Sequence, residues 1–382
     1  MATDHRATLA AAQPDSLVAL DFGDAGRAAE QARAFATRTP VNAVFGVDDD
    51  TAVLGAYLAA ALGLPHNPVD AVLAARDKYR QRILLAGAGL PVPAFALHRF
   101  DDDLAARARS APYPCVLKPT RLAASRGVIR ANGPEEFLAA AERIRGILQD
   151  SDAAAACSAA TGVFLVEQYV AGEEVALEGL LEEGALRVLA VFDKPDPLDG
   201  PFFEETIYVT PSRLDPGRQR DVAITAERAA LALGLESGPV HAELRVNDRG
   251  VWLIELAARP IGGRCSAVLR FGADGAASLE ELLLRRALGM PVASYEREPR
   301  AAAVMMIPTP VAGTLRAVEG VDAARAVPLV EDVVITAHPG QRLVPIPEGS
   351  QYLGFIFARG WAPADVERAV RSAHDRLAVS FA

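Results

Sequence analysis

Two glutamates on neighbouring strand-like segments are the residues best arranged for chemistry. The segments 241–246 (HAELRV) and 251–256 (VWLIEL) flank NDRG, a strong turn signal, and together predict a hairpin. A three-residue loop that ends at a left-handed Gly250 would place Glu255 opposite Glu243. Because strand side chains alternate with a period of two, both carboxylates would point to one face, with Cβ atoms about 5 Å apart.

Carboxylates that face each other across a strand pair repel, so this pair needs a counter-charge. Oxygen ligands suit a hard cation such as Mg²⁺, which usually takes one or two carboxylates together with substrate phosphates. The alternative is a solvated hairpin face with two unrelated acids, although the apolar run 251–254 beside Glu255 argues against full solvation. Spacing alone gives the two interpretations about equal weight.

An arginine and two glycines follow the second glutamate. Arg259 lies four residues after Glu255, where the strand gives way to a loop. Its planar guanidinium suits bidentate contact with a phosphate or carboxylate, and a salt bridge to the acid pair is the alternative. Gly262 and Gly263 would let the backbone approach a ligand closely.

The first part of the chain predicts the α/β elements that would support such a site. Apolar segments of strand length at 17–20 and 41–47 are followed by helical stretches at 24–39 and 50–62, which indicates a parallel sheet. Ligands bind at the C-terminal ends of such strands, which places the acidic run 48–50 near a cleft, although helix capping is the preferred explanation for it. We expect that the first strand–helix unit of a complete doubly wound domain is absent.

Two lysines further along the chain lie at the boundaries of predicted elements. A helix over 76–89 carries Lys78 in its first turn, and a strand within 112–120 has Lys118 near its end. From about residue 300 the sequence becomes β-rich and closes with a helix, which predicts a small C-terminal α+β domain.

The composition excludes several classes of partner. The chain has 382 residues and a net charge of −10, so it has no broad attraction for nucleic acid or for an anionic membrane. Its longest clean apolar run, 51–64, is shorter than the roughly 20 residues that span a bilayer. The three cysteines are widely spaced and match no disulfide or zinc pattern, which favours a cytoplasmic protein.

Five separate elements occur in the order and approximate spacing of the ATP-grasp ligases. They are Lys78 in RDKYRQR, Lys118 in CVLKP, the segment VEQYVAGEE at 166–174, Glu243 and Glu255. The resemblance covers roughly residues 40–290, and IELAAR followed by glycines is most similar to the L-amino-acid ligases, which make dipeptides.

This resemblance implies a fold of mixed class, α/β and α+β. The expected parts are an N-terminal doubly wound parallel α/β domain over 1–75, an ATP-grasp domain over 76–295 with a lid at about 112–172, and an α+β C-terminal domain over 296–382. The oligomeric state is open, and analogy with relatives suggests a homodimer.

The resemblance also implies which residues bind ATP. The set comprises Lys78, Lys118, Ser125, Gly127, Glu167, Gln168, Tyr169, Val170 and Glu174. The two lysines would contact the phosphates, and the loop with Ser125 would cover them. The hinge 168–170 would offer backbone groups to adenine, and Glu174 would bind the ribose, with Glu173 as its exposed competitor.

By the same resemblance, Glu243 and Glu255 would hold Mg²⁺ against the phosphates, with Mn²⁺ as the alternative ion. Arg259, together with Lys118, would act in catalysis by stabilising the transferred phosphoryl group. Many relatives have an asparagine ligand two residues after the second glutamate, whereas this chain has Ala257, so a second ion would have fewer protein ligands.

The substrate pocket is expected on two loops. The loop 192–212 could recognise an ammonium group through its glutamates, with Lys194 near a phosphate, and a solvated acidic loop is the equal alternative. His241 shares the face of Glu243 and is interpreted as a packed core histidine. The substrate set is Glu204, Glu205, Gly262, Gly263 and Arg264.

The implied activity is that of an ATP-dependent carboxylate–amine ligase acting on small molecules. It would form an amide or peptide bond through an acyl phosphate, release ADP and phosphate, and take an amino acid as one substrate. The alternatives are a purine-pathway or biotin-carboxylase-like reaction on the same scaffold, and a non-catalytic ATP-binding sensor or scaffold.

Overall fold

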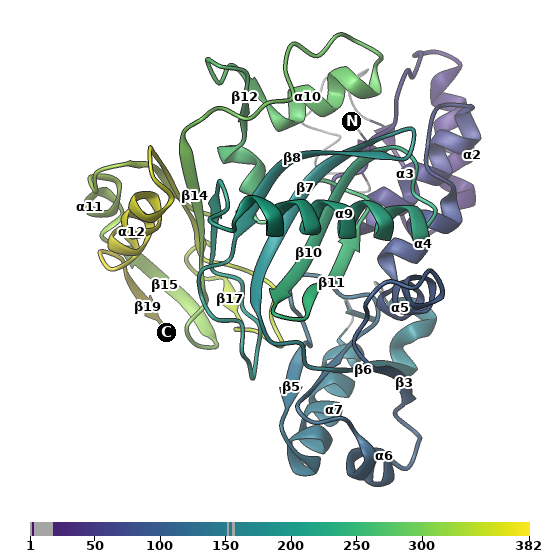
Figure 1. The fold of residues 1–382 in the computed structure, drawn as a ribbon, viewed down its shortest axis with the longest axis vertical. Coiled ribbons are helices and arrows are strands. Elements are labelled where there is room, and N and C mark those ends of the chain that lie inside the picture. The colour runs from purple at the N-terminus through teal and green to yellow at the C-terminus, as the bar shows by residue number, and fades with distance from the viewer. Residues whose placement is uncertain (1, 4–17, 151–152, 155–156) are drawn as a thin grey trace.

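A computed structural model describes residues 2–3, 18–150, 153–154 and 157–382. Its largest sheet has eight strands in the order β11-β10-β7-β8-β9-β14-β18-β16 (Figure 1). The strands are β7 (Glu173–Glu182), β8 (Ala185–Asp193), β9 (Ile207–Thr210), β10 (Gly238–Asn247), β11 (Gly250–Ala257), β14 (Ala301–Ile307), β16 (Val330–Ile335) and β18 (Gly354–Gly360). All neighbouring strands in this sheet are antiparallel.

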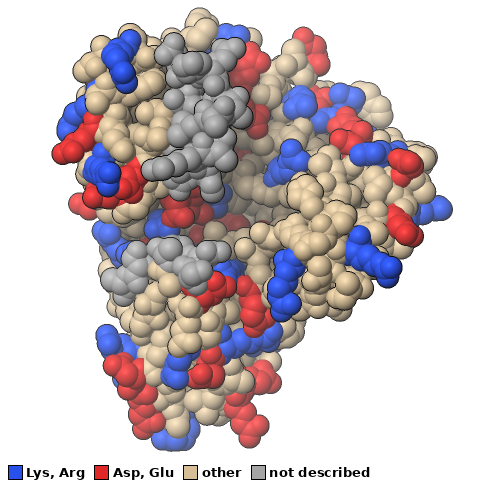
Figure 2. All heavy atoms as spheres, turned by 180° about the vertical axis from the view of Figure 1, so that it is seen from behind, with Lys and Arg blue, Asp and Glu red and all other residues tan. Residues whose placement is uncertain are grey.

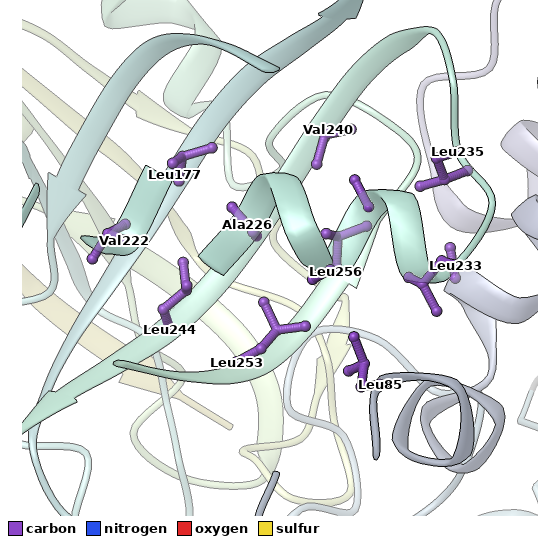
Figure 3. Close-up of a cluster of buried hydrophobic side chains, with 14 of the residues drawn as sticks. Leu85, Leu177, Val222, Ala226, Leu233, Leu235, Val240, Leu244, Leu253 and Leu256 are labelled. Atoms are coloured by element: carbon purple, nitrogen blue, oxygen red, sulfur yellow. The ribbon is translucent and has the colours of Figure 1, made fainter. Parts of the chain in front are cut away.

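Helix α9 (Pro216–Ala232) lies across one face of this sheet, over β7, β10 and β11 (Figures 1 and 3). Asp215 caps its first turn, and Pro216 occupies the first helical position, where its missing N–H costs nothing. Val222 and Ala226, four residues apart on one face of the helix, are fully buried against the leucines of the sheet.

The other face of the sheet is covered as well, which explains the nearly continuous apolar strands. Val175 and Leu177 of β7 belong to the core under α9, whereas Ala176 and Leu180 belong to a second core. That second core contains η2 (Cys265–Val268), the short strands β12 (Arg270–Phe271) and β13 (Ala277–Ser278), and α10 (Leu279–Ala287). Strands buried on both faces lose the alternation that marks a half-exposed sheet.

A second sheet of four strands, in the order β3-β6-β4-β5, forms the part of the molecule at the bottom of Figure 1. Its elements are β3 (Phe95–Arg99), α6 (Leu104–Ser110), β4 (Cys115–Lys118), β5 (Ile129–Ala131), α7 (Pro134–Gln149), η1 (Ser158–Gly162) and β6 (Val163–Gln168). We call this unit the lid. Helix α7 buries Phe137, Ile144 and Leu148 in the lid's own core, so the lid packs as a separate layer.

The N-terminal part differs from the expectation in one strand. It contains β1 (Ala2–Thr3) parallel to β2 (Val18–Ala19), and the helices α2 (Ala25–Ala36), α3 (Asp49–Leu62), α4 (Val69–Arg76) and α5 (Lys78–Gly87). The predicted strand at 41–47 is wrong, because this segment is not in a strand. A strand needs a hydrogen-bonded neighbour, and the described residues offer none beside it. Most of 1–17 lies outside the described residues.

The C-terminal part shares the large sheet with the rest of the chain. Strands β14, β16 and β18 extend that sheet, and α12 (Pro363–His374) packs on β14 and β18. A three-stranded sheet, β17-β15-β19, adds β15 (Gly313–Glu319), β17 (Arg342–Leu343) and β19 (Ala378–Phe381), and α11 (Val321–Arg325) lies beside β16. The boundary at residue 296 therefore stays a prediction.

Two simpler expectations concern the surface and the cysteines. Lys, Arg, Asp and Glu are intermixed on the face seen in Figure 2, which is hollowed between its upper and lower parts. Among the described residues, no helix combines the length and apolarity that a bilayer crossing requires. The three cysteines, Cys115, Cys157 and Cys265, are free and buried.

Candidate active site

The two glutamates of the hairpin face each other, as cross-strand partners on β10 and β11. The predicted three-residue turn is wrong, because Asn247 pairs with Gly250 and only two residues separate them. The side chain of Asn247 accepts a backbone hydrogen bond within this turn at 2.9 Å, which favours the tighter form. A bulge at Ile254 then shifts the register by one residue and restores the pairing of Glu243 with Glu255.

Both glutamates line a cleft between the large sheet and the lid, which has about 970 Å³ of empty space when its opening to solvent is included. The cleft combines apolar walls, which suit a planar base, with convergent charged groups. The sequence-predicted residues that line it are Lys78, Lys118, Ser125, Glu167, Gln168, Tyr169, Val170, Glu174, Glu205, Glu243, Glu255 and Arg259. Segments far apart in the chain therefore meet at one site.

Five of the predicted residues do not line this cleft: Gly127, Glu204, Gly262, Gly263 and Arg264. Gly127 lies in the loop 120–128 with a φ of +73°, and an added Cβ would come within 2.8 Å of the Pro119 ring. Gly263 has a φ of +58°, and a Cβ there would approach the sulfur of Met306 to 2.7 Å. Both positions therefore require glycine for packing and backbone conformation.

The two lysines are buried and already paired. Lys78 Nζ lies 2.8 Å from Glu255 Oε1 and donates to the carbonyl oxygen of Leu122 at 2.8 Å. Lys118 Nζ lies 2.5 Å from Glu167 Oε2. Burial alone would lower the pKa of Lys78, but Glu255 and other nearby carboxylates raise it. Burial does lower the pKa of Lys118, and neighbouring cations add to that effect.

Glu167 forms an ion pair with Arg82, a residue that was not predicted from the sequence. Arg82 Nε lies 2.6 Å from Glu167 Oε1, and both side chains are almost completely buried. Although burial opposes ionisation, Arg82 and Lys118 lower the pKa of Glu167. Glu167 therefore holds Lys118 in place through this ion pair. Arg82 follows Lys78 by four residues on α5, a helical spacing that could have identified it.

Much of the backbone of the hinge between β6 and β7 is hydrogen-bonded to other groups of the protein. The amides of Gln168 and Tyr169 donate to the carbonyl oxygens of Ala94 and Pro114, at 2.8 and 2.9 Å. The carbonyl oxygen of Val170 accepts from an arginine of β10 at 2.7 Å. The backbone groups that remain for adenine are therefore fewer than the sequence suggested.

A cluster of carboxylates surrounds Lys194 at the end of β8. Its Nζ lies 2.8 Å from Glu174 Oε1, 2.6 Å from Glu205 Oε1 and 3.6 Å from Glu243 Oε2. Glu174 also receives Arg245 Nε at 2.8 Å, so two cations engage the residue expected at the ribose. Carboxylate oxygens of the three glutamates lie within 4.8 Å of one another, a donor set suited to a hard cation.

This crowding gives Glu205 an unusual pH response. Burial and the nearby Glu243 raise the pKa of Glu205 to about 7. A carboxyl group whose pKa rises on folding stabilises the fold below its unfolded pKa, and this contribution is lost as the pH rises through about 7. Without ligands, we therefore expect Glu205 to contribute a fall in the melting temperature as the pH rises from about 5 to about 8.

Glu205→Gln should reduce that fall by roughly 2–4 °C, because the neutral amide cannot ionise. Thermal melts at intervals across this pH range measure the effect, with Glu173→Gln as a control at an exposed neighbouring position. Parallel pH profiles for wild type and Glu205→Gln would contradict the assignment.

Arg259 is paired with an acid from the N-terminal part. Its Nε and Nη2 lie 2.9 and 3.2 Å from the two oxygens of Asp49, on the first turn of α3. The salt bridge considered for Arg259 therefore exists, but with Asp49 and not with the hairpin glutamates. Asp48 caps α3 together with Thr51, so the acidic run serves both as a helix cap and, through Asp49, as the partner of Arg259.

His241 lies buried on the wall of the cleft. Its Nε2 is 3.6 Å from Glu243 Oε1, and its Nδ1 is 3.7 Å from Glu178 Oε2. Burial, with Arg259 and Lys194 nearby, lowers the pKa of His241 to about 3, so the ring is neutral. Glu178 is fully buried, and it accepts the amide of Ile261 at 3.0 Å, which fixes the loop after Arg259.

Two family models match the chain: the ATP-grasp domain over residues 111–268 and the L-amino acid ligase C-terminal domain 2 over residues 305–382. The chain therefore carries an ATP-grasp domain, followed by the C-terminal domain found in L-amino acid ligases. The mixed α/β and α+β fold class expected from the sequence is confirmed.

The most informative solved structure is an L-amino acid ligase from Bacillus licheniformis, with 27% identity, a TM-score of 0.83, and coverage of 96% of this chain and 88% of that chain. Carboxyaminoimidazole ribonucleotide synthase from Aspergillus clavatus shares the fold, with a TM-score of 0.72 at 16% identity over 98% of this chain and 91% of that chain.

Among curated proteins, alanine–anticapsin ligase of Bacillus subtilis is 29% identical over 254 residues, which is 62% of this chain and 53% of the relative. The chain thus spans about half the length of these curated relatives.

Proposed function

We propose that this protein is an ATP-dependent carboxylate–amine ligase that takes an amino acid as one substrate and forms an amide or peptide bond. The observation that carries the proposal is the meeting of two buried lysines, two facing glutamates and Arg259 in one cleft. The names of its relatives, an alanine–anticapsin ligase and an L-amino acid ligase, support an amino-acid substrate.

In this proposal, a substrate carboxylate attacks the terminal phosphorus of ATP, which gives an acyl phosphate and ADP. An amine then attacks the acyl carbon and displaces phosphate, so that the amide forms and a proton leaves the nitrogen. Lys78 and Lys118 bind the phosphates, and Arg259 neutralises charge on the group in transfer. Catalysis of phosphoryl transfer consists mainly of positioning and charge stabilisation, which these buried cations suit.

The carboxylates of the cleft fit a magnesium ion. Glu243 and Glu255 are cross-strand neighbours at the cleft wall, and burial together with Glu174 and Glu255 raises the pKa of Glu243. Burial is the main cause of that upward shift and the neighbouring carboxylates add to it, and a divalent cation would stabilise the ionised carboxylates. Mg²⁺, when bound, would neutralise phosphate charge, and Glu243 and Glu255 would hold it.

The substrate ammonium group is assigned to Glu205. Glu205 lines the cleft, and its second oxygen accepts the Tyr208 hydroxyl at 2.7 Å. Its neighbour Glu204 lies outside the cleft lining, so of the two predicted glutamates Glu205 is the better placed. Gly262, Gly263 and Arg264 begin three residues after Arg259 and remain proposed pocket residues.

A screen of phosphate release across pairs of amino acids and small carboxylates, with mass spectrometry of the products, tests this function. We expect ADP, phosphate and a new amide in equal amounts for at least one pair. Nucleotide binding without ADP release for any pair would favour a sensor or scaffold. Turnover that requires bicarbonate and a biotinylated carrier would favour a carboxylase, and either result would overturn the ligase proposal.

A further inference from the structure

A turn from the C-terminal part lies against the back of the loop that covers the cleft. The loop spans residues 120–128, and Leu122, Ser125 and Val128 contribute to the cleft lining. The turn spans residues 345–349, and the amide of Gly349 closes it by donating to the carbonyl oxygen of Pro345 at 2.8 Å. We call these segments the cover loop and the C-terminal turn.

Three sets of contacts join them. The amide of Gly127 donates to the carbonyl oxygen of Pro347 at 2.9 Å. Arg126 Nε donates to the carbonyl oxygen of Glu348 at 2.8 Å. Arg143 of α7 pairs with the Glu348 carboxylate through both its Nε and its Nη2, the latter at 2.8 Å. The lid and the C-terminal part are therefore hydrogen-bonded directly, although they are separated by about 200 residues of sequence.

The cover loop has a conformation that benefits from outside support. Ala124 and Ser125 adopt left-handed backbone angles, with φ of 53° and 54°, which residues with a Cβ rarely adopt. Gly127, the residue that meets the C-terminal turn, is itself restricted to glycine by its φ of +73° and by the Pro119 ring. Two internal hydrogen bonds, at 3.2 and 3.1 Å, are the backbone links within the turns of the loop.

The cover loop is also held by α5, where the amide and Nζ of Lys78 donate to the carbonyl oxygens of Thr120 and Leu122 at 2.9 and 2.8 Å. The lid sheet and the eight-stranded sheet are separate sheets, so no strand ladder among the described residues connects them. A further contact lies next to the cover loop, where the amide of Arg130 in β5 donates to the carbonyl oxygen of Pro201, in the loop 192–212, at 2.8 Å. The Arg143 guanidinium also stacks on the Phe202 ring at 4.7 Å, so one arginine contacts both the C-terminal turn and this loop.

We propose that the C-terminal turn positions the cover loop over the nucleotide, with Arg126, Arg143 and Glu348 as positioning residues. The assignment rests on the proposed function, because it takes the cover loop to face the phosphates of ATP. The cleft-lining side of the loop carries Ser125, whereas its opposite side carries the contacts to the turn. The C-terminal domain thereby contributes to nucleotide binding without touching the nucleotide.

Glu348→Arg tests the proposal, since it sets a third cation against Arg126 and Arg143. We expect nucleotide affinity, measured by calorimetry with Mg–ATP and no second substrate, to fall about tenfold, and trypsin to cleave the cover loop faster after Arg121 and Arg126. The double variant Arg143→Glu with Glu348→Arg should recover most of the affinity because it restores the pair. The melting temperature should change little, because exposed ion pairs contribute little to folding stability.

Asp332→Arg is the matched control, because Asp332 forms an exposed ion pair with Arg325 in the same C-terminal part at 3.3 Å. Unchanged affinity and cleavage in a folded Glu348→Arg protein, or an equal loss in the control, would overturn the proposal. If the wild type bound nucleotide but ligated nothing, only the proposed function would fail. If the wild type bound no nucleotide, the ligase proposal would fail and the cleavage comparison would decide the role of the turn.

Discussion

Arg259→Ala is expected to lower ligation turnover by about 10²–10³-fold while leaving nucleotide affinity within roughly threefold of wild type. The guanidinium lines the cleft together with the hairpin glutamates, and the proposed function assigns its charge to the group in transfer. Turnover is measured as ADP release under saturating substrates, and affinity by calorimetry with Mg–ATP. Near-normal turnover would remove Arg259 from the catalytic assignment.

The control for this variant is Asp49→Asn. Arg259 lies against Asp49 with two contacts, and despite burial the arginine lowers the pKa of Asp49. Removing the arginine therefore leaves a carboxylate unpaired, which destabilises the fold as well as the site. Asp49→Asn keeps the arginine, and we expect it to retain most of the turnover. An equal loss in both variants would show that the ion pair, and not the arginine's own charge, is what the reaction requires.

Glu255→Gln is expected to weaken Mg–ATP binding by at least tenfold, or about 1.4 kcal/mol. A neutral amide cannot offset the charge of a divalent ion, and Lys78 loses the carboxylate that now fixes it at 2.8 Å. ATP is titrated into the protein once with Mg²⁺ and once with EDTA. Only the titration with Mg²⁺ reports the loss of a metal ligand, whereas both titrations report the loss of the Lys78 partner.

Glu243→Gln should reproduce the loss seen with magnesium, since it removes the facing carboxylate. Glu173→Gln, at an exposed position one residue before Glu174, should bind as wild type does. If Glu255→Gln weakened ATP binding equally with and without magnesium, Glu255 would be a support for Lys78 and not a metal ligand.

Much of the local structure could be predicted, because the chain marks its elements with strong signals. Asp24 and Asp215 cap α2 and α9 as side-chain acceptors, and Pro134 begins α7. The pairing of Glu243 with Glu255 followed from period-two counting, although a two-residue turn and a bulge produced it in place of the three-residue turn. The shorter turn and the bulge each shift the register by one residue, and the prediction was correct because the two shifts cancel.

The partners of the site residues were harder to predict, since they come from distant segments. No local pattern indicates that Asp49 meets Arg259, 210 residues later, or that Glu178 accepts the amide of Ile261. Lys194 was easier to predict as a site residue, because it follows an apolar strand and precedes a proline, as Lys118 does. Its position among three glutamates still required the tertiary fold.

The segment 41–47 shows that a local pattern can also predict a strand that does not form. Its apolar, β-branched composition predicts a strand, yet strand formation depends on a neighbour that the segment itself does not encode. The C-terminal part shows the same dependence, since β14, β16 and β18 joined the large sheet and did not form a sheet of their own.

The most direct measurement for the magnesium site is a crystal structure with Mn²⁺ and a non-hydrolysable ATP analogue, using anomalous scattering to locate the metal. We predict a peak bound by carboxylate oxygens of both Glu243 and Glu255 and by the terminal phosphates, with Arg259 beside them. An ordered nucleotide in this cleft whose metal contacts neither glutamate would contradict the account.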